Sequence, residues 1–373
     1  MRLAAAHGIR SGRIVDPLPL DSAPEVQLAL SRLSLGQLAQ DGLRSFVGRN
    51  ETWAGRTAAG RDIFVKRLHG PGSQDRYRRC LAYERLADAI RFRTLRSPRL
   101  VGADERSAVL VYELVPGATP ATDLAERDGL GEGWSRQVGR AVGELHSSQV
   151  PASDHIEPDR AKRLRLVHDL EVAEYAESSG ATLDVWAMLQ HDEPVAARVD
   201  RLADESTSVS WVLVHGDLRF DQFLLADTDI YIVDWEEFQA ADPAVDVGAM
   251  AGEWLLRAAS ETFAEVADPG TPPGQVHEEI VTRGERELAS VRPLVAAFWS
   301  GYREERTDLD PGSVQALAVR ATAYAGLHLF DRSLASSMFR AKLGAVQRAI
   351  AGIGRAALLS PEQHVAAIGL GGV

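Results

Sequence analysis

Three polar side chains near the middle of the sequence are of the types that bind a metal ion or accept a proton. Asp217 and Gln222 lie within the segment 212–225, and Asp234 ends the apolar run that follows a turn at 227–229. Apolar runs of four or five residues bounded by turn formers are typical of short buried strands. We therefore expect a rigid hairpin that presents these side chains at its loops, where catalytic groups are often found.

The spacing of these residues matches the needs of phosphoryl transfer. That reaction requires an acceptor hydroxyl held in line, a carboxylate close to it, and oxygen ligands that hold magnesium on the phosphates. His215, Asp217 and Gln222 reproduce the spacing His-x-Asp-x-x-x-x-Asn of kinase catalytic loops, with Gln in the place of Asn. Asp234, at the end of the next strand, stands where kinases place the metal-chelating Asp.

The two segments 215–222 (His-Gly-Asp-Leu-Arg-Phe-Asp-Gln) and 232–236 (Ile-Val-Asp-Trp-Glu) resemble one family. They are similar to the "HGDLHxGN…xIDWE" region of the aminoglycoside phosphotransferase and choline kinase-like superfamily. The segment 242–246 (Asp-Pro-Ala-Val-Asp) resembles the DPxxD segment of that family. The resemblance covers about residues 46–260. It implies an α+β, bilobal protein-kinase-like fold with a small antiparallel N-lobe sheet and a mainly helical C-lobe.

The resemblance also implies roles for these residues. Asp217 would orient the acceptor hydroxyl and take its proton. Asp234 and Gln222 would bind Mg²⁺, which prefers one or two carboxylates together with phosphate oxygens and water. His215 would fix the catalytic loop, and Asp246 would anchor the loop from behind.

Three positions depart from the family pattern. Gln222 offers the carbonyl oxygen of the usual Asn one methylene further out, so the metal geometry must shift. Asp221 replaces the usual Gly and adds a second carboxylate nearby. Arg219 replaces a frequent His and could reach a phosphate or an acidic acceptor.

Residues 46–68 are predicted to form antiparallel strands, because turn residues separate short β-rich runs. Lys66 is one of only three lysines among 41 basic residues. It resembles the kinase lysine that reaches the α- and β-phosphates, a role that suits a compact charge on a flexible stem. The turn at Gly48 would cover the nucleotide. Glu84, within a helix expected at 74–93, would pair with Lys66.

The segment 108–117 is predicted to be a buried strand that ends at Pro-Gly. It resembles the family's hinge, in which the backbone of Glu113, Leu114 and Val115 would hydrogen-bond the adenine. Backbone recognition leaves little side-chain signal, so ATP is expected and GTP stays possible.

The rest of the chain has mainly helical patterning. Helices are expected at 23–43, 134–146, 161–176, 182–202, 247–263, 276–303, 312–334 and 339–359. Residues 1–45 would form an N-terminal extension, 46–116 the nucleotide-binding N-lobe, and 117–373 the C-lobe with the catalytic loop, metal and acceptor sites.

Composition indicates an ordinary globular protein, with 45% hydrophobic and 25% charged residues. No apolar run has membrane-spanning length. The N-terminus lacks a secretory apolar region, because His7, Arg10 and Arg13 interrupt it. Cys80 is the single cysteine, which excludes an intrachain disulfide and a cysteine metal cluster. We therefore expect a cytoplasmic protein that does not bind a membrane.

The net charge of −12 is unevenly distributed. Residues 1–110 contain 19 Lys and Arg against 11 Asp and Glu, whereas the remainder contains 22 against 42. A basic first part suits the phosphates of a nucleotide, and an acidic second part suits a cationic acceptor. The acidic balance argues against nucleic acid as a partner.

Three functions remain open on the sequence. The first is an ATP- and Mg²⁺-dependent phosphotransferase that acts on a hydroxyl of a small molecule. The second is a Ser/Thr kinase of a precursor peptide, as in lanthipeptide and thioamitide pathways, working with a partner lyase. The third is a pseudokinase that binds a nucleotide or a partner without turnover. Candidate acceptor contacts are Arg219, Trp235, Glu236 and Trp254.

Overall fold

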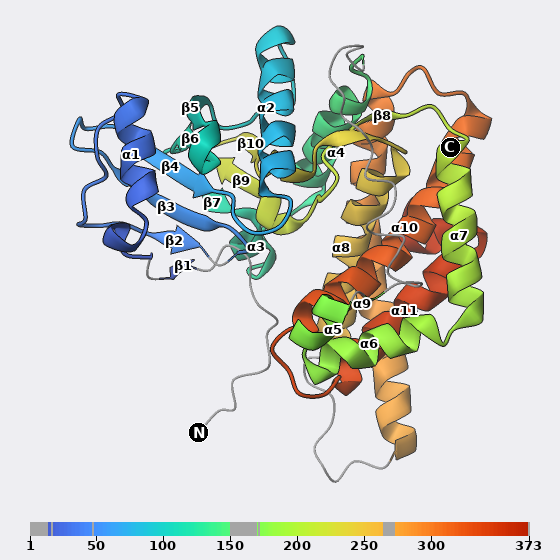
Figure 1. Ribbon diagram of the computed structural model, residues 1–373. Helices are drawn as coiled ribbons and strands as arrows, with labels where there is room; N and C mark the ends of the chain where they lie inside the picture. Colours follow the sequence, from blue (N-terminus) through green and yellow to red (C-terminus); the bar gives the residue numbers. More distant parts are fainter. Residues whose placement is uncertain are drawn as a thin grey trace.

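The computed structural model describes residues 14–15, 18–46, 48–149, 170, 172–263 and 273–371. An antiparallel sheet with two flanking helices forms the N-terminal part, and a larger, mostly helical part follows (Figure 1). The predicted α+β architecture is therefore confirmed. Among the described helices, none is long and apolar enough to cross a membrane.

The elements of the N-terminal part come in the following order. They are β1 (Ile14–Val15), the 3-10 helix η1 (Leu20–Ser22), α1 (Pro24–Arg32), β2 (Ser45–Phe46), β3 (Glu51–Arg56), β4 (Asp62–Arg67), α2 (Ser73–Ala89), β5 (Leu100–Asp104), η2 (Glu105–Ser107) and β6 (Val109–Glu113).

The helical part begins beyond β6, and its described residues contain three further short strand pairings. Its elements are β7 (Thr119–Pro120), α3 (Ala121–Ala125), α4 (Glu132–His146), α5 (Val172–Glu177), α6 (Gly180–Gln190), α7 (Glu193–Thr207), β8 (Val212–Val214), η4 (Phe220–Gln222), β9 (Phe223–Ala226), β10 (Asp229–Ile232), η5 (Trp235–Glu237), β11 (Gln239–Ala241), α8 (Ala244–Phe263), α9 (Pro273–Glu305), α10 (Pro311–Ser337), α11 (Ala345–Leu359) and α12 (Pro361–Ile368).

The four-stranded sheet has the order β3-β4-β6-β5, and all of its neighbours are antiparallel. Successive side chains of a strand point to opposite faces. Val65 packs in the cluster that includes α1. Leu110 packs with Tyr77 and Cys80 of α2 on the other face. Because Lys66 follows Val65 and lies opposite Leu110, its side chain leaves the sheet on the face that α2 covers.

Two predicted helices differ from the structure. The helix expected at 23–43 ends at Arg32, because Ser34 and Gly36 have positive φ angles that a helix cannot continue through. The helix expected at 182–202 is two helices, α6 and α7. Asp192 separates them, because its side chain accepts a hydrogen bond from the Val195 N–H at 3.3 Å and caps α7.

Most other predicted helices are present with shifted ends. The helix expected at 74–93 is α2 and ends at Ala89, and the helix expected at 339–359 begins at Ala345. The helices expected at 134–146, 247–263, 276–303 and 312–334 correspond to α4, α8, α9 and α10. The helix expected at 161–176 falls mostly outside the described residues.

Two close helix contacts fix the base of the helical core. A Cβ atom added to Gly139 of α4 would lie 2.0 Å from the Phe298 carbonyl oxygen of α9. A Cβ atom added to Gly301 of α9 would lie 2.1 Å from the Arg136 carbonyl oxygen. Glycine is therefore required at both positions, and the two backbones pack almost in contact. This packing sets the position of His146, the last residue of α4.

The short strands bring two loops side by side. β9 and β10 pair so that Phe223 lies opposite Ile232, and β8 pairs with β11. The loop before β9 and the loop after β10 therefore lie at the same end of the hairpin. The Val233 N–H donates to the Gln222 carbonyl at 2.9 Å and extends this pairing by one residue. The hairpin predicted from the apolar runs positions both polar loops.

Candidate active site

Asp246, buried in the first turn of α8, holds the loop that follows β8. It accepts hydrogen bonds from the backbone N–H groups of His215 (2.7 Å) and Gly216 (2.9 Å). His146 Nε2 lies 3.2 Å from the same carboxylate. Burial would raise the pKa of Asp246, but the hydrogen bonds from His146 and from the Gly216 N–H lower it below its usual value. The contacts match the anchoring role expected of this residue.

His215 connects the two loops. Its Nε2 lies 2.9 Å from the Val233 carbonyl oxygen, and the Asp217 N–H donates to its Nδ1 at 3.3 Å. A ring that donates at Nε2 and accepts at Nδ1 is the neutral imidazole. Both nitrogens are thus used to hold the backbone. This arrangement fits a loop-fixing residue better than a base.

Gly216 adopts a backbone conformation that favours glycine, with φ of +84°. An added Cβ atom would lie 2.4 Å from the Glu237 carbonyl oxygen. We expect Gly216→Ala to lower the free energy of unfolding by about 3 kcal/mol, from backbone strain plus the clash. Urea denaturation checks this value.

Gly60 provides the matched control for that substitution. Its φ is +81°, and no atom lies within 4 Å of an added Cβ. Gly60→Ala should therefore show the strain alone, about 1 kcal/mol. Equal losses in the two variants would mean that the close approach to Glu237 contributes nothing.

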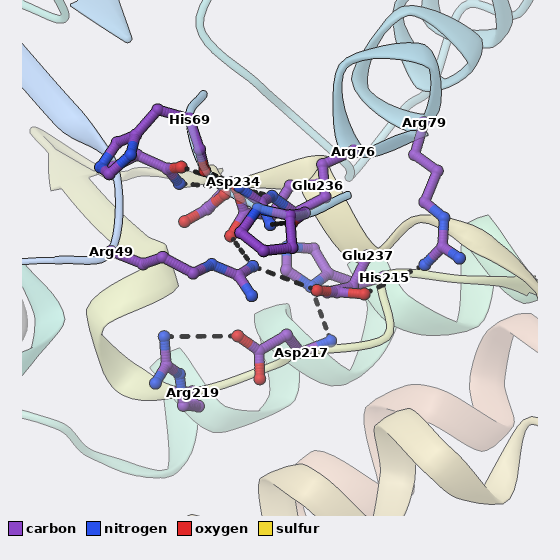
Figure 2. Close-up of polar contacts among 12 residues, drawn as sticks. Arg49, His69, Arg76, Arg79, His215, Asp217, Arg219, Asp234, Glu236 and Glu237 are labelled. Carbon is purple, nitrogen blue, oxygen red and sulfur yellow. Dashed lines mark hydrogen bonds and ion pairs between the residues drawn. The ribbon is translucent and has the colours of Figure 1, made fainter. Parts of the chain in front are cut away.

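Asp217 and Arg219 face each other on the loop between β8 and η4 (Figure 2). Arg219 Nη2 lies 3.3 Å from Asp217 Oδ2, and its Nε lies 3.3 Å from Asp221 Oδ1. Burial would lower the pKa of Arg219, but the two carboxylates raise it. Asp217 and Asp221 are therefore held by one partly buried cation. The second carboxylate noted in the sequence lies beside the first.

Lys66 and Asp234 form an ion pair across the cleft, from β4 to the loop after β10. Lys66 Nζ also lies 3.1 Å from Glu236 Oε2. Burial would lower the pKa of Lys66, which is 7% exposed, but the adjacent carboxylates of Asp234 and Glu236 raise it. The three residues on which the sequence argument depends, Lys66, Asp217 and Asp234, line one cleft with a volume of about 1830 Å³.

Glu84 does not pair with Lys66, contrary to the expectation from the kinase pattern. The ion pairs of Lys66 within the described residues are to Asp234 and Glu236. Glu84 lines the same cleft, and its Oε1 is buried with no hydrogen-bond partner in the described chain. Burial, with a smaller contribution from Asp88, raises the pKa of Glu84 to about 8. The side chain is therefore mostly protonated at neutral pH.

This raised pKa predicts a pH dependence of stability. Because the folded protein binds the Glu84 proton more tightly than the unfolded chain, this contribution is complete below about pH 4.5 and is lost as pH rises toward 8. We expect Glu84→Gln to abolish this loss of stability. As pH rises, the free energy of unfolding of the variant should therefore increase relative to that of the wild type by at most about 1.4 kcal/mol per pH unit. Urea denaturation at pH 5, 6, 7 and 8 measures the difference, and a constant offset between the two proteins would contradict it.

The expected nucleotide contacts also line the cleft. Gly48, Glu113, Leu114 and Val115 all belong to its wall. The Glu113 N–H donates to the Arg99 carbonyl at 2.9 Å, and the Leu114 N–H donates to the Asp62 carbonyl at 3.1 Å. Two of the three backbone donors expected to bind adenine are thus used within the protein.

Of the four residues expected at the acceptor, one lies outside the cleft lining and two of the others make close contacts within the protein. Trp254 is 1% exposed and packs in the core, with its ring centroid 4.7 Å from that of Phe220. Trp235 is buried against Tyr83, with ring centroids 3.5 Å apart. Glu236 is bound by cations of the N-terminal part. Trp254 therefore does not line the cleft, whereas Arg219, Trp235 and Glu236 do.

The far end of the cleft is lined by residues that the sequence did not identify. They are Trp186 of α6, Ser206 of α7, Trp211 before β8, and Tyr324, His328, Asp331 and Arg332 of α10. The spacing of the α10 residues places them on one face of that helix. This stripe of polar and aromatic residues is the sequence signal that could have identified the α10 residues of the cleft. The N-terminal residues Arg49 and Asn50, next to the predicted Gly48 turn, were also missed.

The oxygen donors on the cleft wall fit a magnesium ion bound together with phosphates. Among the described residues, no three His, Cys, Asp or Glu side chains are grouped as a self-sufficient metal site. Mg²⁺ does not need such a group, because it usually takes one or two carboxylates and completes its shell with phosphate oxygens and water. Asp234 and Gln222, adjacent across the hairpin, supply a carboxylate and a carboxamide there.

Comparison with known proteins identifies the family that the chain matches. A model described as the phosphotransferase enzyme family (APH) matches residues 48–272. No curated protein sequence matches the chain.

Solved structures share the fold at low sequence identity. An amicoumacin kinase, hAmiN, in complex with AMP-PNP, Ca²⁺ and Ami is 13% identical, with a TM-score of 0.51 over 92% of this chain and 96% of that one. A choline/ethanolamine kinase family protein from Mesorhizobium loti is 17% identical, with a TM-score of 0.51 over 95% and 100%. The choline kinase LicA from Streptococcus pneumoniae is 16% identical, with a TM-score of 0.50 over 91% and 99%.

Proposed function

The chain belongs to the phosphotransferase enzyme family, and from this premise we propose that it transfers the γ-phosphoryl group of ATP to a hydroxyl of a small molecule. One observation carries the proposal: Lys66 and Asp234, which are ion-paired, line the same cleft as Asp217. A cation for the phosphates, a carboxylate for the metal and a carboxylate for the hydroxyl are the parts that phosphoryl transfer needs.

Asp217 is the catalytic carboxylate in this proposal. The acceptor oxygen forms a bond to the γ-phosphorus while the bond from that phosphorus to the β,γ-bridging oxygen breaks. The hydroxyl proton passes to Asp217, and ADP leaves with the electron pair of the broken bond. Arg219, 3.3 Å from Asp217 Oδ2, holds the carboxylate in place. His215 and Asp246 fix the loop that carries it.

The remaining roles concern the nucleotide. Asp234 and Gln222 would hold Mg²⁺, which supplies charge neutralisation on the phosphates when bound. Lys66 binds the phosphate chain, and the segment from Gly48 covers it. The Glu113 and Leu114 N–H groups bond within the protein, so we assign adenine recognition to Val115. In this proposal residues 46–116 form the nucleotide-binding lobe, 117–373 the catalytic lobe and 1–45 an extension.

The acceptor binds at the far end of the cleft. Trp186, Trp211 and Tyr324 offer ring faces there, and Asp331 and Arg332 offer one charge of each sign. Such a chamber suits a small ring-bearing or hydroxylated molecule with polar substituents. None of the described residues adds an observation that favours a precursor peptide or a partner lyase.

The test is direct. Purified protein is incubated with ATP, Mg²⁺ and a panel of hydroxylated small molecules, and products are read by mass spectrometry together with acceptor-dependent ADP release. A phosphorylated acceptor supports the proposal. Nucleotide binding with Mg²⁺ but no phosphorylated product from any small molecule or peptide would instead identify a pseudokinase.

A further inference from the structure

The carboxylate of Glu236 is contacted by several donors from the N-terminal part. Its Oε1 accepts a hydrogen bond from Arg49 Nη2 at 2.5 Å. Its Oε2 accepts one from Asn50 Nδ2 at 2.7 Å and lies 3.1 Å from Lys66 Nζ. Figure 2 shows Arg49 reaching across to Glu236 and Glu237 from the far side of the cleft. Both oxygens of this carboxylate are therefore held from the N-terminal part.

Arg76, on the first turn of α2, also lies close to the Glu236 carboxylate. It is 6% exposed, and its Nε lies 3.7 Å from Glu236 Oε2 with no hydrogen-bond partner among the described residues. Its other nitrogens donate to the His69 and Pro71 carbonyls at 2.8 and 3.0 Å. An unsatisfied buried guanidinium nitrogen aimed at an anion site is costly unless the site is filled. Arg76 therefore adds charge to a site that is built to hold an anion.

Glu236 is contacted by more cations than its neighbours are. Arg49, Lys66 and Arg76 all lie close to it, whereas Asp234 pairs with Lys66 and Glu237 pairs with Arg49 in this cluster. Charge-assisted donors arranged around one carboxylate are equally suited to the oxygens of a phosphate. A polyphosphate carries several times the charge of Glu236 and would make the same contacts more strongly.

We propose that Arg49, Asn50, Lys66 and Arg76 form the binding site for the phosphate chain of the nucleotide, and that Glu236 is an internal anion which fills this site until the nucleotide displaces it. The inference rests on the proposed function and deepens it. It assigns phosphate-binding roles to Arg49 and Asn50 and a positioning role to Arg76. Glu236 becomes a competitor of the nucleotide within the protein.

Displacement is physically reasonable at this position. The Arg49 side chain is 48% exposed and lies on the loop between β2 and β3, so it can exchange one anion for another. Glu236 follows Asp234 by two residues and lies on η5, outside the α-helices and the sheet. Release of Glu236 from Lys66 and Arg49 would also leave Lys66 free to contact phosphate. The same donors therefore bind either Glu236, when no nucleotide is present, or the phosphates of the nucleotide.

The test measures the affinity for inorganic tripolyphosphate, and for AMP-PNP, by isothermal titration calorimetry in EDTA without added metal. Glu236→Gln removes the competing charge and should bind both probes about tenfold more tightly than the wild type. Arg49→Gln should bind them about tenfold more weakly, since a hydrogen bond to a charged group contributes about 1.4 kcal/mol or more. Asn50→Ala should weaken binding in the same direction.

A matched variant controls for the loss of positive charge alone. Arg79→Gln removes an arginine that pairs with Glu237 at 3.0 Å, whereas the ion pairs of Glu236 among the described residues are to Arg49, Lys66 and Arg76. It should bind the probes within about threefold of the wild type, because charge effects without direct contact are screened by salt. Equal effects at Arg49 and Arg79 would overturn the assignment of Arg49.

The outcomes separate this inference from the proposed function. If the wild type fails to bind AMP-PNP even with Mg²⁺, both are overturned. If the wild type binds AMP-PNP but Glu236→Gln binds tripolyphosphate no more tightly, only the displacement by Glu236 is overturned. Circular dichroism verifies that each variant is folded. Should Glu236→Gln not fold, Arg49→Gln and Asn50→Ala decide the matter, because unchanged tripolyphosphate affinity in both would overturn the site.

Discussion

Asp217→Asn lowers kcat for phosphoryl transfer by about 10³-fold and leaves the affinity for AMP-PNP with Mg²⁺ within about twofold of the wild type; this is the expected result of removing a positioned general base. Asparagine keeps the size of the side chain and the loop backbone, which Asp246 and His215 hold. It cannot take the proton of the acceptor hydroxyl. Steady-state ADP release and calorimetric binding measure the two effects separately.

Asp221→Asn is the matched control for that variant. Asp221 contacts the same Arg219, at 3.3 Å, and lies four residues further along the loop. Its loss should lower kcat by about tenfold or less, since it acts through Arg219 rather than on the hydroxyl. If kcat fell further in Asp221→Asn than in Asp217→Asn, the assignment of the proton transfer to Asp217 would be wrong.

The second large effect is on stability. Asp246→Asn should lower the free energy of unfolding by about 3 kcal/mol, because two backbone N–H groups and His146 lose a buried charged acceptor. The asparagine can accept with one atom only, so its amide nitrogen faces a donor. Activity should fall together with stability. Urea denaturation at pH 7 gives the value.

The pH dependence of that loss is a further readout. The pKa of Asp246 is lowered in the folded protein, so its carboxylate stabilises the fold above about pH 4 and the contribution disappears as pH falls further. The difference between wild type and Asp246→Asn should therefore shrink in acid. Asp62→Ala, which breaks an exposed ion pair with Arg56, should cost much less stability, because an exposed ion pair contributes little. A loss at Asp246 no larger than at Asp62 would contradict the anchoring role.

The family assignment and the overall architecture could be predicted because the informative residues are close in sequence. Asp217 and Gln222 share one short loop, and Asp234 follows on the paired strand. The alternation of side chains along β4 also determines the face on which Lys66 lies. Local spacing and period are enough for such placements, and the structure brings these residues to one cleft as expected.

The pairing of Lys66 could not be predicted in the same way. Its partner depends on how α2 is rotated relative to the sheet and on the path of η5. The kinase pattern pointed to Glu84 on α2, but Glu236 on η5 takes that position. Glu236 is far from Lys66 in the sequence, so residue spacing could not indicate this pairing.

The residues at the far end of the cleft were missed for a different reason. Trp186, Trp211 and Tyr324 come from three separate elements and meet only because the helices pack in one particular order. Trp254 was a reasonable choice from composition. However, α8 is buried on most of its surface, so its pattern does not distinguish a cavity wall from the core.

Cys80 gives this protein a built-in reporter. The thiol of the chain's single cysteine is 1% exposed at the cleft wall, between α2 and the sheet that carries Lys66, and burial raises its pKa. A disulfide reagent can react with it only during excursions that separate α2 from the strands. The rate of thiol modification in the native protein therefore measures how often α2 separates from the sheet, without any introduced label. A ligand that holds α2 against the sheet would be recognised by a slower reaction.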